Sequence, residues 1–258
     1  MTIPAFAPPF TAERVGLGGW YFLAFIGVLL PWMAWRSRAK LAGRPVLPTR
    51  TRHFTSIIFT QIFLLALALA ITTVCGIRLY PTVVPRLRDW LLGALSLAAM
   101  LAFVFPRWKG AVRKGDRRLY FFMPSGAKEK ALWVGISAAA GFGEESVYRG
   151  VLFALLFALT GNLWIAAVLG ALIFAAGHAF QSARSMAMIF VFSLLFQTLV
   201  IVTGALYVSM AVHFLYDVTA GFTYSRLGRE MGYQAQGDPT AAAPIPAAEA
   251  RVETGLPS

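Results

Sequence analysis

Six ionisable side chains lie inside long apolar stretches of this sequence, where charged residues are rare and commonly serve a function. They are Glu144, Glu145, Arg149, His178, His213 and Asp217. A charge at the centre of a membrane-spanning helix costs about 2.5–3.5 kcal/mol, so three in one span cost roughly 8–10 kcal/mol if they remain unpaired. We therefore expect these groups to face the interior of a helix bundle and to pair there.

The spacing of these residues predicts which side chains share a helix face. Glu145 and Arg149 are four residues apart and can form an ion pair along one face. Glu144 is rotated by about 100° from Glu145, so it can face a cavity while its neighbour is neutralised. His213 and Asp217 are also four residues apart and can interact along one face of another helix.

Two further features accompany these groups. His178 follows Phe174 by one helical turn and is predicted toward the inner end of its span. Gly141 and Gly143 precede the two carboxylates. Small residues at such positions allow helices to approach closely, or leave room for water or a substrate backbone.

Apolar stretches in the sequence must position these side chains, and a spanning helix needs roughly 20 such residues. We predict spans over residues 17–35, 54–75, 90–105, 131–159, 163–180, 186–203 and 206–222. The composition agrees, because 58% of the residues are hydrophobic and only 13% are charged. Ordinary soluble domains have about 45–50% apolar and about 25% charged residues. The predicted fold class is all-α, a polytopic transmembrane helix bundle of about seven spans.

The predicted topology rests on the distribution of Lys and Arg between the spans. Two loops are rich in them, one with Arg36, Arg38, Lys40, Arg44, Arg50 and Arg52, the other with Arg107, Lys109, Arg113, Lys114, Arg117, Arg118, Lys128 and Lys130. The positive-inside rule places both loops in the cytoplasm, so the C-terminus is expected inside and the N-terminus outside. The net charge of +12 arises largely from these loops. No basic stripe with interleaved aromatic residues accompanies it, so we expect the lipid bilayer as a partner and no nucleic acid.

The chain divides into three predicted parts. Residues 1–126 hold the first three spans and their basic loops, and residues 127–226 form a core of four spans that carries the ionisable side chains. Residues 227–258 are rich in Ala, Pro and Gly without apolar periodicity, which predicts a disordered tail. No basic residue precedes Arg14, so the first apolar run is expected to be a retained span and not a signal peptide.

Three short motifs resemble those of a known family. The residues Glu144-Glu145-Ser146-Val147-Tyr148-Arg149 match its EExxxR motif, Phe174–His178 its FxxxH motif, and His213–Asp217 its HxxxN or HxxxD motif. This family is CPBP, the CAAX proteases and bacteriocin-processing proteins, also called Abi. The motifs occur in the family order on separate apolar stretches, and the resemblance covers about residues 131–222.

The resemblance implies peptide hydrolysis by a glutamate inside the membrane. Glu144 matches the family glutamate that activates water as a general base, and His178 matches the residue that holds and polarises this water. Glu145 and Arg149 would fix the helix and the local field. Burial makes a carboxylate a better base near pH 7, which fits this chemistry.

The third motif departs from the pattern of the best-understood family members. His213 and Asp217 match the positions that stabilise the oxyanion, and those members carry Asn where this chain carries Asp217. An ionised Asp cannot donate a hydrogen bond, whereas Asn can. We therefore expect either a protonated Asp217 or, preferably, an Asp217 that accepts a hydrogen bond and orients His213.

Alternative interpretations are also consistent with the sequence. Glu, His and Asp can bind zinc with three protein ligands and a water, but the HExxH motif is absent. We therefore expect no cofactor, while zinc stays open as the less favoured reading. The acidic residues could instead form a structural cluster in a non-proteolytic scaffold, immunity or regulatory protein. A proton-coupled transporter is less favoured, because neither repeats nor paired broken helices are evident.

The function that these observations favour is an intramembrane endopeptidase. Its expected substrate is a membrane-associated peptide or protein, lipidated or CAAX-like, that is cut near the cytoplasmic face. Frequent Ala, Gly and Arg favour a prokaryotic source, so the bacterial cytoplasmic membrane is the expected location.

Overall fold

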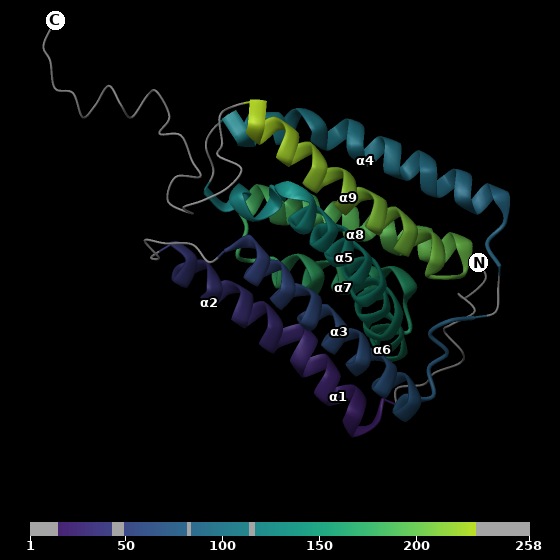
Figure 1. Cartoon of the computed structure of the whole chain (residues 1–258). Helices are drawn as coiled ribbons and strands as arrows, with labels where there is room; N and C mark the ends of the chain where they lie inside the picture. The colour runs from purple at the N-terminus through teal and green to yellow at the C-terminus, as the bar shows by residue number, and fades with distance from the viewer. Residues whose placement is uncertain (1–14, 43–48, 82–83, 114–116, 231–258) are drawn as a thin grey trace, which may run out of the picture.

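The structure of the protein, a computed structural model, describes residues 15–42, 49–81, 84–113 and 117–230 (Figure 1). Within these ranges the chain is helical and contains no strand. In chain order the elements are α1 Gly16–Ala24, π-helical η2 Phe25–Leu29, α2 Leu30–Ala42, α3 Arg50–Cys75, α4 Leu87–Arg113, 3-10 helical η3 Arg117–Phe122, α5 Gly126–Glu144, π-helical η4 Glu145–Leu152, α6 Phe153–Thr160, α7 Leu163–Gly177, α8 Ala183–Thr203 and α9 Tyr207–Glu230. The predicted all-α, polytopic helix bundle is confirmed.

Each of the seven predicted spans is helical, although several helix ends differ from the prediction. α4 continues through Pro106 to Arg113, because polar residues can extend a helix beyond the apolar run that predicted it. α5 begins at Gly126, where φ is +66°, before the predicted start of the fourth span. α9 runs to Glu230, past the predicted boundary of the tail, and residues 231–258 lie outside the described ranges.

Four described helices are long and apolar enough to cross a membrane by length and composition. They are Gly16–Ser37, Arg50–Cys75, Leu87–Arg113 and Ala183–Thr203. Leu163–Gly177 is apolar but shorter. α5 and α9, which carry Glu144, His213 and Asp217, are not among these four.

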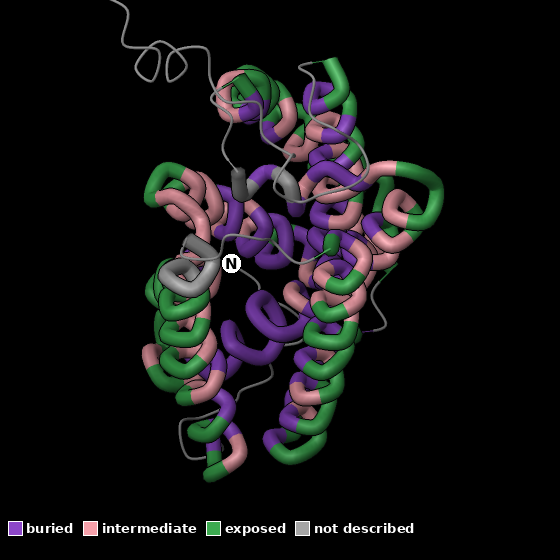
Figure 2. Tube along the Cα trace, turned by 60° about the vertical axis from the view of Figure 1, so that its left-hand side comes forward, coloured by how far each residue is buried: buried purple, intermediate pink, exposed green. Residues whose placement is uncertain are grey.

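α5 lies at the centre of the bundle, with α3 packed on one side and α9 on the other (Figure 1). α7 packs against α6 and α8, and α4 covers α9. Every residue from 145 to 156 is buried, whereas the outer helices expose much of their surface (Figure 2). The motif carboxylates therefore start the most deeply buried stretch of the chain.

Glycines allow α5 to approach its neighbours closely, as the sequence predicted. A Cβ at Gly141 would lie 3.0 Å from the Met210 carbonyl oxygen of α9, and a Cβ at Gly143 would lie 3.1 Å from the Gln61 carbonyl oxygen of α3. Both distances are shorter than an ordinary van der Waals contact. These two small residues therefore set the separation between the three helices that form the site.

The closest packing of α5 on α9 involves Trp133 and Gly221. The indole Nε1–H of Trp133 donates a 2.9 Å hydrogen bond to the Asp217 carbonyl oxygen, and a Cβ at Gly221 would lie 2.1 Å from Nε1.

We expect Gly221→Ala to destabilise the fold by about 1–3 kcal/mol, because a buried indole ring cannot move aside freely. Gly110→Ala is the matched control, since a Cβ there meets nothing within 4 Å. Thermal unfolding in detergent measures both, and equal melting temperatures for the two variants would contradict the expectation.

Candidate active site

The EExxxR motif lies where α5 changes from an α-helix to a π-helix. Glu144 is the last residue of α5, and Glu145 begins the π-helical segment η4, which ends at Leu152. The wider turn was not predicted from the sequence, which suggested a regular helix. Short π-helical insertions are frequent at functional sites because they redirect side chains from the regular helical spacing.

Glu145 is the centre of the polar network and has no solvent exposure. Its Oε1 accepts a 2.8 Å hydrogen bond from Nδ1–H of His213 and lies 3.1 Å from Nη1 of Arg149. Its Oε2 accepts a hydrogen bond from the hydroxyl of Ser209. The predicted ion pair between Glu145 and Arg149 is therefore present, and Glu145 also orients His213.

Arg149 is held by charge and by aromatic rings. Its Cζ lies 4.2 Å from the ring centroid of Phe174 in α7 and 5.2 Å from that of Phe196 in α8. Its Nη2 donates a 3.1 Å hydrogen bond to the Ser193 hydroxyl. The guanidinium, 1% exposed, thereby connects η4 to α7 and α8.

Glu144 faces away from Glu145 and toward α3 and α9. Its Oε1 accepts a 2.6 Å hydrogen bond from Nε2 of Gln61, and its Oε2 lies 3.8 Å from Nε2 of His213. Oδ2 of Asp217 lies 3.6 Å from the same Nε2. The side chains of Glu144 and Asp217 are 13% and 26% exposed, so this edge of the network is its most accessible part. The structure thus brings together both motif carboxylates, His213 and Asp217.

His178 lies at the end of α7 and not within the helix, because α7 ends at Gly177 and not at Phe180 as predicted. Nδ1–H of His178 donates a 2.9 Å hydrogen bond to the Phe174 carbonyl oxygen, which leaves Nε2 as an acceptor in the neutral ring. Tyr148 connects this end of α7 to η4. Its Oη lies 3.4 Å from the position of a Cβ at Gly177, and its ring packs edge-on against Phe174 at 4.8 Å.

Among the described residues, His178 is connected to the EExxxR segment through Phe174 and Tyr148. No hydrogen bond or ion pair links His178 directly to Glu144 or His213 within residues 117–230. α5 and α9 bring Glu144 and His213 together, and α7, which ends beside His178, contacts η4. The common site of His178 with Glu144 and His213 stays a prediction.

The sequence left zinc as the less favoured alternative to glutamate catalysis. In the described part of the chain, no three His, Cys, Asp or Glu side chains are grouped as metal ligands. Nδ1–H of His213 donates to Glu145 and Nδ1–H of His178 to a backbone carbonyl, an arrangement common in metal-binding histidines that leaves Nε2 of both rings available.

Three residues near the motifs were missed from the sequence. Ser209 precedes His213 by four residues, so helical spacing would have placed it on the same face. Gln61 is an amide within the apolar run of the second predicted span, and such a residue commonly forms interhelical hydrogen bonds. Tyr148 lies inside the EExxxR motif, but its contact with Gly177 depends on the crossing of η4 and α7.

The segment between α3 and α4 packs against the other side of η4. Leu79 is 4% exposed, and the Tyr80 hydroxyl forms a 2.7 Å hydrogen bond with the Ser146 hydroxyl. Burial raises the pKa of Tyr80, so the phenol stays protonated at neutral pH and can share this hydrogen bond. Tyr207 donates a further 2.8 Å hydrogen bond to the Pro81 carbonyl oxygen. These contacts cover the side of η4 next to the motif carboxylates.

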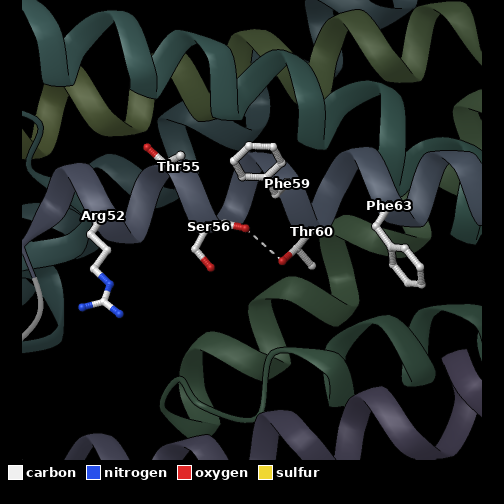
Figure 3. Close-up of a pocket in the computed structure, with 6 residues that line it drawn as sticks. All are labelled: Arg52, Thr55, Ser56, Phe59, Thr60 and Phe63. Atoms are coloured by element: carbon white, nitrogen blue, oxygen red, sulfur yellow. Dashed lines mark hydrogen bonds between the residues drawn. The ribbon is translucent and has the colours of Figure 1, made fainter.

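An open pocket of about 650 Å³ lies along α3 (Figure 3). Its lining consists of Arg52, Thr55, Ser56, Phe59, Thr60 and Phe63. Thr60 donates its hydroxyl to the Ser56 carbonyl oxygen, as the dashed line shows. None of the motif residues lines this pocket, so it is separate from the polar network.

Comparison with known proteins agrees with the motifs. The family model described as type II CAAX prenyl endopeptidase Rce1-like matches residues 127–219, which contain all six motif residues. Neither the curated proteins nor the solved structures contained a match to the chain. The apolar helices and the family match fit an integral membrane protein. Residues 127–219 are thus similar to the Rce1-like family of CAAX-type proteases, in agreement with the resemblance of the motifs to CPBP.

Proposed function

We propose that the protein is an intramembrane endopeptidase that hydrolyses a peptide bond with water activated by Glu144. The proposal rests on the position of Glu144 relative to His213. Oε2 of Glu144 lies 3.8 Å from Nε2 of His213, and the other ring nitrogen of His213 is hydrogen-bonded to Glu145. A base and an electrophilic group that face one another across a small gap can act on water and on a carbonyl group.

Glu144 acts as the general base in this mechanism. Its Oε2 takes a proton from a water molecule, and the resulting hydroxide attacks the carbonyl carbon of the scissile peptide. The protonated carboxyl then returns the proton to the leaving amine when the C–N bond breaks. His178, whose Nε2 remains an acceptor, holds the water at the rim of the site.

His213 stabilises the oxyanion of the tetrahedral intermediate. Since Nδ1–H is donated to Glu145, Nε2 can donate only when the ring is an imidazolium. The carboxylates of Glu144, Glu145 and Asp217 surround the ring and supply the negative charge that balances this cation. The Asp217 carboxylate lies 3.6 Å from Nε2 of His213 and favours the imidazolium by its charge, a role that needs no donated hydrogen bond.

The substrate is a membrane-associated peptide or protein, with a lipidated or CAAX-like peptide as the favoured class. A site surrounded by apolar helices favours a chain that is already anchored in the bilayer. The basic loops place the C-terminus in the cytoplasm by the positive-inside rule, and the bacterial cytoplasmic membrane is the proposed location.

A comparison of membrane peptides tests this function. Cells that produce the wild-type protein are compared with cells that produce Glu144→Ala at the same level, and new peptide termini in the membrane fraction are identified by mass spectrometry. We expect at least one terminus that depends on Glu144. Identical sets of termini, with both proteins folded in the membrane, would count against a protease.

A further inference from the structure

Gln61 is a polar residue in the middle of α3, a helix that the match to residues 127–219 does not include. It is 7% exposed and lies on the face of α3 that packs against α5. A buried amide inside an apolar helix is costly unless it forms hydrogen bonds. We therefore expect the Gln61 amide to form a hydrogen bond with a residue of a neighbouring helix.

The partner is the carboxylate assigned as the general base. Nε2 of Gln61 donates a 2.6 Å hydrogen bond to Oε1 of Glu144. Gly143 allows this approach, because a Cβ there would lie 3.1 Å from both the carbonyl oxygen and Oε1 of Gln61. The glycine before Glu144 thus brings the α3 amide into contact with the carboxylate.

The orientation of the amide follows from its two chemically different ends. An ionised carboxylate can only accept hydrogen bonds, so the NH₂ end must face Glu144. The opposite end, Oε1 of Gln61, is buried and has no hydrogen-bond partner among the described residues. A buried acceptor without a partner is costly. The buried Oε1 of Gln61 therefore costs stability, while its NH₂ group donates to one carboxylate oxygen of Glu144.

We infer that Gln61 is a positioning residue for Glu144, so that the active site extends beyond the Rce1-like segment into α3. The amide holds Oε1 and thereby directs Oε2 toward His213 and the water to be activated. This inference rests on the proposed function, because it needs Glu144 to be the base.

Two substitutions at this position separate a positioning role from a packing role. Gln61→Met keeps the length of the side chain and removes its hydrogen bonds, and a base displaced by about 1 Å can lose roughly 10²-fold in rate. We expect kcat to fall by roughly 10–100-fold while KM stays within about twofold of the wild-type value. Gln197→Met is the matched control, since Gln197 is also buried in an apolar helix and does not contact Glu144.

Gln61→Glu tests the same contact through the pH profile. Two adjacent carboxylates share one proton, so the acidic limb of the kcat profile is expected to move to higher pH. The other titratable or charged groups around Glu144 are His213 and Asp217 from α9, and Glu145, Tyr148 and Arg149 from η4. They are the same in every variant, so a shifted limb reports on position 61 itself. A carboxylate at position 61 that pointed away from Glu144 would not move it.

The assay uses the full-length protein in detergent or liposomes, with the membrane peptide whose terminus depends on Glu144, and includes Glu144→Gln in parallel. One set of results would overturn the inference and leave the proposed function intact. In it, Glu144→Gln is inactive, Gln61→Met keeps the wild-type kcat, and Gln61→Glu shows an unshifted pH profile. Full activity in Glu144→Gln would overturn both. If Gln61→Met does not fold, the pH profile of Gln61→Glu decides the question alone.

Discussion

Glu144→Gln is expected to lower kcat by about 10²–10⁴-fold, the usual contribution of a general base. The amide has nearly the shape of the carboxylate, and its oxygen can still accept the hydrogen bond from Gln61. It cannot remove a proton from water. Because the ground-state contacts of the residue are kept, we expect thermal stability and KM to change little. Turnover of the membrane peptide by purified protein in liposomes measures the effect.

Glu230→Gln is the control for this prediction. Glu230 is an exposed acid at the end of α9 and pairs with Arg226, far along the helix from His213. Its replacement removes one carboxylate from the same protein without altering the network, so its kcat should equal that of the wild type. A Glu144→Gln protein that turns over as fast as Glu230→Gln would exclude Glu144 as the base.

Arg149→Met is expected to destabilise the protein by about 3–5 kcal/mol, the largest effect on stability that we predict. The substitution removes the guanidinium that pairs with the fully buried Glu145, and with it the contacts of the guanidinium with two aromatic rings. Met fills a similar volume, so the loss reports on charge more than on a cavity. Unfolding in mixed detergent micelles, followed by circular dichroism, measures the change.

Arg226→Met provides the matched control, because it removes an ion pair with the same four-residue spacing at the surface. The side chains of Arg226 and Glu230 are 76% and 52% exposed, and water screens such a pair, so the expected change is below about 1 kcal/mol. Similar destabilisation by both substitutions would mean that burial of the Glu145–Arg149 pair has no special consequence. Partial rescue by Arg149→Lys would support the role of the charge.

Sequence patterns predicted the elements well because hydrophobic length and helical spacing are local properties. Each of the seven predicted apolar runs is helical in the described residues, and the four-residue spacing of Glu145 and Arg149 predicted their ion pair. The glycines before the motif predicted close packing, which is observed. The ends of α4, α7 and α9 were predicted less well, because polar residues can continue a helix and no single residue marks its last turn.

The sequence by itself determined that this chain forms apolar helices carrying Glu144, His178 and His213 in a family order, since these follow from residue type and spacing. Only the tertiary structure decided which side chains meet. The hydrogen bond from Gln61 to Glu144 joins residues 83 positions apart, and the π-helical turn at Glu145 aims the two carboxylates at different partners. Such contacts depend on how helices cross, and crossing depends on packing across the whole bundle, which local spacing does not encode.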